Sequence, residues 1–108
     1  MPNYTFPGVP EEGLFDRVVE LARGAEAAGF DLVTVMDHFY QIPGVGPEEN
    51  AMLESYSTLA ALAASTSRVK LGTLVTGVTY RNPALLAKIA VTVDHLSGGR
   101  LEFGIGAA

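Results

Sequence analysis

Apolar residues recur along the chain at two alternating spacings. From Pro10 to Ala28 they follow the period of a helix, and a proline with two acidic residues opens this segment as a helix start should. Gly29 suits the left-handed conformation that often ends a helix. The run 31–36 that follows is almost entirely apolar, which is typical of a strand in a parallel sheet. The pattern therefore predicts a helix followed at once by a strand.

The same alternation occurs twice more. An Ala- and Leu-rich segment, 51–65, predicts a second helix, and 69–75 predicts a second strand. An Asn-Pro pair opens 83–96, which predicts a third helix, and 100–105 predicts a third strand. Helices that alternate with strands in this way predict an α/β fold with a parallel sheet and right-handed crossovers. The spacing alone leaves both a doubly wound sheet and a (β/α) barrel open.

Composition narrows the class of protein. The chain has 108 residues, which predicts a single domain, 1–108. Its net charge is −5 and its 7 basic residues are scattered, which argues against binding to nucleic acid. It has no cysteine, so neither a disulfide framework nor a thiolate metal site is available. We find no apolar segment of transmembrane length and no signal-peptide pattern at the N-terminus, so we expect no membrane association and a cytoplasmic location.

The candidate chemistry lies where the three predicted strands end. Asp37 and His38 follow the first, Thr76 and Gly77 the second, and a Gly-x-Gly at 104–106 ends the third. Because α/β folds place their chemistry at the carboxyl ends of strands, these residues would line one side of a pocket.

Each of these signals is weak by itself. An Asp-His pair is as compatible with a structural role, in which the aspartate caps a loop and the histidine is an ordinary polar residue, as it is with a catalytic role. The Gly-x-Gly lacks the third glycine of a dinucleotide-binding fingerprint. The histidines and acidic residues do not have the spacing of a metal site, so we predict none.

Four motifs occur in order along the chain: Asp37-His38-Phe39, Arg68 to Thr76, Tyr80 to Lys88, and Asp94 to Gly106. Together they resemble one known family, the bacterial luciferase-like monooxygenases, and more narrowly its members that use the deazaflavin coenzyme F420. The resemblance covers almost the whole chain and implies a partial (β/α)8 TIM-type barrel. It also implies that strand one and the C-terminal half of the barrel are missing, so that 1–108 is a single partial barrel domain.

The resemblance assigns roles to particular residues. His38 and Asp37 would be catalytic, because an imidazole can exchange protons near neutral pH while a hydride moves. The expected cofactor-binding residues are Asp37, Leu74, Val75, Thr76, Gly77 and Gly106. In this family the second strand ends with a non-prolyl cis peptide behind the cofactor ring, which corresponds here to the bond between Leu74 and Val75.

The implied function is that of an oxidoreductase that transfers a hydride between reduced F420 and a small organic substrate. The alternative cofactor is FMN, which would imply monooxygenation. Homo-oligomerisation is expected in the full-length parent, and the fragment alone is expected to be inactive. A different class remains open: a non-catalytic half-barrel that self-associates through its uncovered strand edges.

Overall fold

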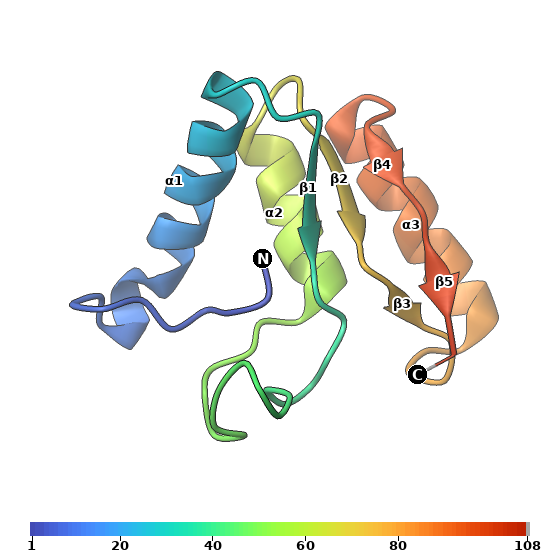
Figure 1. Cartoon of the computed structure of the whole chain (residues 1–108). Helices are drawn as coiled ribbons and strands as arrows, with labels where there is room; N and C mark the ends of the chain where they lie inside the picture. The colour runs from blue at the N-terminus through green and yellow to red at the C-terminus, as the bar shows by residue number, and fades with distance from the viewer. Residues whose placement is uncertain (108) are drawn as a thin grey trace.

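A computed structural model describes residues 1–107 and shows three helix–strand units (Figure 1). A 3-10 turn, η1 (Glu11–Gly13), leads into α1 (Leu14–Ala27) and then β1 (Leu32–Val35). The second unit consists of α2 (Ser55–Ser65), β2 (Lys70–Thr73) and β3 (Thr76–Gly77). The third consists of α3 (Pro83–Ser97), β4 (Leu101–Glu102) and β5 (Ile105–Gly106).

The strands are parallel and follow one another in space in chain order. One sheet has the order β1-β2-β4, and a second, shorter pair joins β3 to β5. Val33 of β1 lies opposite Leu71 of β2, and Thr76 of β3 lies opposite Ile105 of β5. A doubly wound sheet would place the first strand between the others, whereas this order is that of consecutive units of a barrel. The predicted α/β fold with parallel strands is confirmed.

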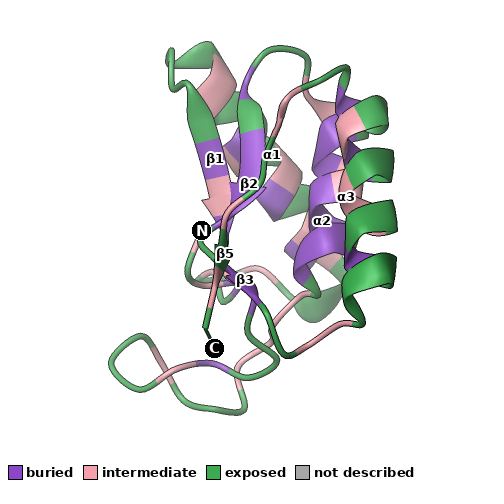
Figure 2. Cartoon of the chain, turned by 90° about the vertical axis from the view of Figure 1, so that its right-hand side faces the viewer, coloured by how far each residue is buried: buried purple, intermediate pink, exposed green. Residues whose placement is uncertain are grey.

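The core lies between the sheet and the helices on one side of it (Figure 2). Val33 and Val35 of β1 are buried, whereas Leu32 on the opposite face is 44% exposed. In Figure 2 buried segments gather where the strands and α2 face each other, and the outer side of α3 is largely exposed. In the part of the chain that the structure describes, no helix is both long and apolar enough to cross a membrane.

The second helix and the last two strands differ most from the predicted elements. The second helix begins at Ser55 and not at residue 51, because Glu54 has an extended backbone and its carboxylate accepts a hydrogen bond from the Ser57 N–H at 2.7 Å, which caps the helix there. The strand predicted at 69–75 divides into β2 and β3 around Leu74 and Val75. The strand predicted at 100–105 likewise divides into two, β4 and β5, because β4 pairs with β2 and β5 pairs with β3.

Two charged side chains tie together the end of the sheet at which the strands begin. The Glu26 carboxylate at the end of α1 accepts hydrogen bonds from the backbone N–H groups of 67–69, just before β2. These bonds lower the pKa of Glu26 from 4.5 to about 2. Arg100 donates to four carbonyl groups, of Ala63, Thr66, Val69 and Ser97, and so joins the ends of α2 and α3 to the start of β2.

Candidate active site

The predicted site residues from three separate segments meet where the strands end. The Gly77 N–H donates to the Asp37 carboxylate at 2.9 Å, which joins the end of β3 to the residues after β1. Gly106 lies opposite Gly77, and the Val78 N–H donates to the Gly106 carbonyl at 3.0 Å. The expectation that these strand ends share one rim therefore holds in the structure (Figure 1).

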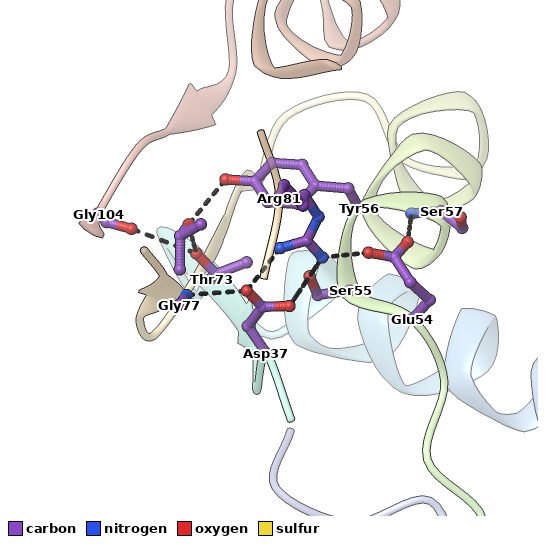
Figure 3. A network of polar contacts seen from close by, with 10 residues as sticks. Asp37, Glu54, Ser55, Tyr56, Ser57, Thr73, Gly77, Arg81 and Gly104 are labelled. Atoms are coloured by element: carbon purple, nitrogen blue, oxygen red, sulfur yellow. Dashed lines mark hydrogen bonds and ion pairs between the residues drawn. The ribbon is translucent and has the colours of Figure 1, made fainter. Parts of the chain in front are cut away.

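Asp37 is the centre of this arrangement (Figure 3). Its side chain is buried, and its two oxygens accept four hydrogen bonds. Oδ1 accepts from the Ser55 hydroxyl at 2.7 Å and from Arg81 Nη2 at 2.9 Å. Oδ2 accepts from the Gly77 N–H at 2.9 Å and from Arg81 Nη1 at 2.8 Å. Burial alone would raise the pKa of Asp37, but the bonds from Arg81, Ser55 and Gly77 hold it below its ordinary value.

Arg81 approaches the same carboxylate from the loop before α3. Both of its terminal nitrogens contact Asp37, which gives the two-pronged geometry that arginine forms with carboxylates. Nη2 also contacts the Glu54 carboxylate, and the guanidinium lies 4.9 Å from the centroid of the Tyr56 ring. Hydrogen bonding to Asp37 raises the pKa of Arg81 above its ordinary value. The cluster of Asp37, Glu54 and Arg81 thus carries one positive and two negative charges.

A second chain of hydrogen bonds continues from Tyr56 along the rim. The Tyr56 hydroxyl and the Thr76 hydroxyl are 2.7 Å apart, and the Thr76 and Thr73 hydroxyls are 2.6 Å apart. The Thr73 hydroxyl reaches the Gly104 carbonyl at 3.4 Å. Thr76 is completely buried, so its hydroxyl faces into the protein. Its backbone N–H donates a hydrogen bond to the Gly104 carbonyl at 2.9 Å. The hydroxyls of the two threonines therefore join β2, β3 and the segment before β5.

His38 has a different environment from its neighbour Asp37. It is exposed and makes no hydrogen bond or ion pair within residues 1–107. Phe39, the next residue, is 57% exposed and stacks on Tyr80, with the ring centroids 4.3 Å apart. A Cβ atom at Gly77 would lie 2.8 Å from the Tyr80 ring, so glycine is required there for this packing. The imidazole is thus carried on a loop that is anchored on both sides.

Leu74 and Val75, between β2 and β3, present an apolar surface. They are 68% and 43% exposed, and the peptide bond between them is cis, as the resemblance implied. A Cβ atom at Gly106 would lie 2.6 Å from Val75, so the backbone of β5 approaches that side chain closely. A shallow cavity of about 160 Å³ borders this surface and is lined by Met1, Pro2, Thr34, Val35, Met36 and Leu74.

Glu54, Ser55, Tyr56 and Arg81 were not among the predicted site residues. The first three lie in the segment 51–65, which was predicted only as a helix, and Arg81 lies in the Tyr80 to Lys88 motif, in which no site residue was predicted. These residues lie close to Asp37 because of the way α2 and the loop before α3 pack against the sheet. The spacing of apolar residues in the sequence does not predict that packing. The available signal was charge: Arg81 is the one basic residue between the second strand and the third helix.

The chain matches known proteins in sequence and in fold. The family model described as luciferase-like monooxygenase matches residues 3–108. An F420-dependent glucose-6-phosphate dehydrogenase of Nocardia farcinica is 39% identical over 90 residues, which are 82% of this chain and 26% of that protein. The chain thus spans about a quarter of the length of this curated relative.

Two solved structures share the arrangement of helices and strands. The oxygenating constituent of 3,6-diketocamphane monooxygenase from Pseudomonas putida, in complex with FMN, has a TM-score of 0.80 at 23% identity and covers 100% of this chain and 28% of its own. A monooxygenase of Streptomyces bottropensis has a TM-score of 0.76 at 31% identity over 98% of this chain and 31% of its own. Since the family model matches almost every residue, the chain belongs to the luciferase-like monooxygenase family.

Proposed function

We propose that this chain forms one side of the active site of an F420-dependent oxidoreductase, which transfers a hydride between reduced F420 and a small organic substrate. The observation that carries the proposal is the pairing of an exposed histidine, His38, with an exposed apolar surface, Leu74 and Val75, at neighbouring strand ends. A relative that is 39% identical is named for its dependence on F420.

The residues present fit a planar ring cofactor. Leu74 and Val75 offer apolar side chains, and Gly106 adds backbone without a side chain next to Val75. Such a surface suits the face of an aromatic ring system, which binds through apolar contact and nearby backbone groups. When bound, a deazaflavin supplies the hydride chemistry, and the protein supplies position and electrostatics. In this proposal Leu74, Val75 and Gly106 hold the ring.

His38 is the proposed proton-transfer residue. His38 is exposed and directly follows Asp37, whose carboxylate accepts the N–H of Gly77, two residues after Val75. An imidazole can accept or donate a proton near neutral pH. Hydride transfer to or from a carbon that bears oxygen needs a proton to move at that oxygen, and His38 would hold or release it.

Asp37 and Thr76 support the site from within. All four hydrogen bonds of Asp37 go to protein groups, so the proposal gives Asp37 the task of holding the loop before His38. Thr76 and Gly77 likewise form the end of β3 behind Val75, with the Thr76 hydroxyl engaged by Tyr56 and Thr73. A direct bond from Asp37 to a cofactor would require one of its present donors to leave.

FMN-dependent monooxygenation is the second candidate. The solved monooxygenase of Streptomyces bottropensis is 31% identical to this chain and has the same fold, which favours monooxygenation. The apolar surface of Leu74 and Val75 suits a flavin ring as well as a deazaflavin ring, so the two candidates use the same residues.

A cofactor titration tests the proposal. Protein expressed from the complete reading frame that carries this sequence is mixed with F420 or with FMN, and binding is followed by fluorescence. We expect saturable binding of F420 that is tighter than that of FMN, and weaker binding when Leu74→Asp places a charge on the apolar surface. Tighter binding of FMN would favour the second candidate, and no binding of either would refute both.

A further inference from the structure

We propose that Arg81 is a positioning residue that fixes the loop carrying His38 and the segment carrying Leu74 and Val75 in one arrangement. The proposal rests on the proposed function for the importance of those two segments. It is independent of that function in its geometry, which is carried by the contacts among Arg81, Asp37 and Gly77.

The guanidinium lies where three segments come together. Its side chain is 9% exposed, and its two terminal nitrogens contact both oxygens of Asp37 at 2.8 and 2.9 Å. Nη2 also contacts Glu54, the cap of α2, and reaches the Ser55 hydroxyl at 3.3 Å. One side chain from the loop before α3 therefore holds the end of β1 against the start of α2.

The effect of Arg81 reaches the cofactor surface through Asp37. The carboxylate that Arg81 holds also accepts the Gly77 N–H, two residues after Val75. His38 follows Asp37 directly in the chain, so the orientation of one carboxylate sets the path of both segments. Without the guanidinium, the negative charges of Asp37 and Glu54 would face each other, and the Asp37 side chain would turn toward water and leave Gly77 without its acceptor.

A second contact acts in the same direction. Arg81 lies over the ring of Tyr56, whose hydroxyl is hydrogen-bonded to Thr76, the residue between Val75 and Gly77. The bonds through Asp37 and the bonds through Tyr56 reach neighbouring residues of β3. Arginine is needed for this because only its planar fork spans both oxygens of a carboxylate while its face covers a ring, whereas a lysine ammonium is a point charge.

The test compares Arg81→Lys with Arg17→Lys. Arg17 is exposed, and among the described residues its ion pair is with Glu20 of the same helix. Labelling with 15N-glycine follows hydrogen exchange of the Gly77 amide. The internal control is Gly99, which donates to the Asp94 carbonyl at the opposite end of α3 from Arg81. We expect Gly77 to exchange at least tenfold faster in Arg81→Lys, with Gly99 unchanged. The affinity for F420 or FMN should fall at least tenfold in Arg81→Lys and stay as in wild type in Arg17→Lys.

The outcomes separate this proposal from the proposed function. Unchanged exchange at Gly77, or equal acceleration at Gly77 and Gly99, overturns the positioning role, as does faster exchange with unaltered cofactor affinity. If wild type binds neither cofactor, the proposed function fails. Faster hydrogen exchange at Gly77 alone in Arg81→Lys would still support the positioning role of Arg81. Should Arg81→Lys not fold, Glu54→Gln removes the second carboxylate from Arg81 and should accelerate Gly77 exchange to a smaller extent, and no acceleration would contradict the proposal.

Discussion

Replacing Asp37 by asparagine removes one charge from the centre of the site while keeping the shape of the side chain. Each oxygen of Asp37 accepts one bond from Arg81 and one from a second donor, Ser55 or Gly77. An asparagine amide has one oxygen and one NH₂ group. If the NH₂ group faces Gly77 and Arg81 Nη1, it meets two donors and two hydrogen bonds are lost. If it faces Ser55 and Arg81 Nη2, the Ser55 hydroxyl can accept from it and only the bond from Arg81 is lost. At least one hydrogen bond is therefore lost together with the ion pair.

The expected loss of stability follows from the burial of the pair. The side chains of Arg81 and Asp37 are 9% and 2% exposed, and removing one partner of a buried pair costs about 3–5 kcal/mol. Glu54, which is 43% exposed, remains beside Arg81 and offsets part of its charge. We therefore expect Asp37→Asn to lower the free energy of unfolding by about 3 kcal/mol, at the low end of that range.

Urea unfolding followed by far-UV circular dichroism at pH 7 measures this difference. The matched control is Glu20→Gln, which breaks the pair between Arg17 and Glu20, whose side chains are 44% and 66% exposed. An exposed pair of this kind contributes about 0.5 kcal/mol or less. A loss in Asp37→Asn no larger than that in Glu20→Gln would refute the account of Asp37 as a buried, fully bonded charge.

The pH dependence gives a second measurement on the same variant. The pKa of Asp37 in the folded protein lies below its ordinary value of 3.8, so the carboxylate stabilises the fold above that value. This contribution is lost as the pH falls through the lowered pKa, because the folded protein then also binds the proton. The difference in stability between wild type and Asp37→Asn should therefore shrink below about pH 4, and a constant difference would contradict this linkage.

Three further changes have expected outcomes. His38→Ala should lower turnover about 10²–10⁴-fold while changing cofactor affinity less, as kinetics and fluorescence titration would show; unaltered turnover would exclude proton transfer by His38. The pKa of Glu26 is lowered from 4.5 to about 2, so Glu26→Gln should flatten the fall in stability between those pH values, measured as the urea midpoint at each pH. Gly72→Ala would place a Cβ atom 2.5 Å from the Glu102 carbonyl oxygen and should cost about 1–3 kcal/mol in urea unfolding, because β2 and β4 must separate.

The parts of the fold that the sequence predicts well are those governed by local spacing. The third helix was expected at 83–96 and is observed at Pro83–Ser97, because Asn82 accepts from the N–H groups of Ala84 and Leu85 and Gly98 adopts φ +67° at its end. The start of the second helix was less predictable. Residues 51–54 are compatible with a helix by type, and the Glu54 carboxylate that caps the helix at Ser57 also contacts Arg81, a tertiary contact that spacing does not report.

The candidate site shows the same division. Asp37 and Gly77 could be predicted as site residues because both lie at strand ends, where such folds place their chemistry. Asp37 follows the predicted strand 31–36, and Gly77 is the last residue of β3. Their direct hydrogen bond depends on register, since Thr34 of β1 lies opposite Gly72 of β2 and the chain must turn at Leu74 and Val75 to bring Gly77 beneath Asp37. Hydrophobic period does not encode that register, so the partners of Asp37 emerged only from the structure.

The two ends of the sheet use charge in different ways. Where the strands begin, Arg100 and Glu26 bond almost entirely to backbone groups, which ties helices to strands regardless of side-chain chemistry. Where the strands end, Asp37 and Arg81 bond to each other and to side chains of α2, and an exposed histidine follows directly. Backbone anchoring suits the end of a barrel that provides stability, and a side-chain network suits the end whose loops differ between members of a fold. Substitutions at Arg100 should therefore affect stability alone, whereas substitutions at Arg81 should affect both stability and the geometry around His38.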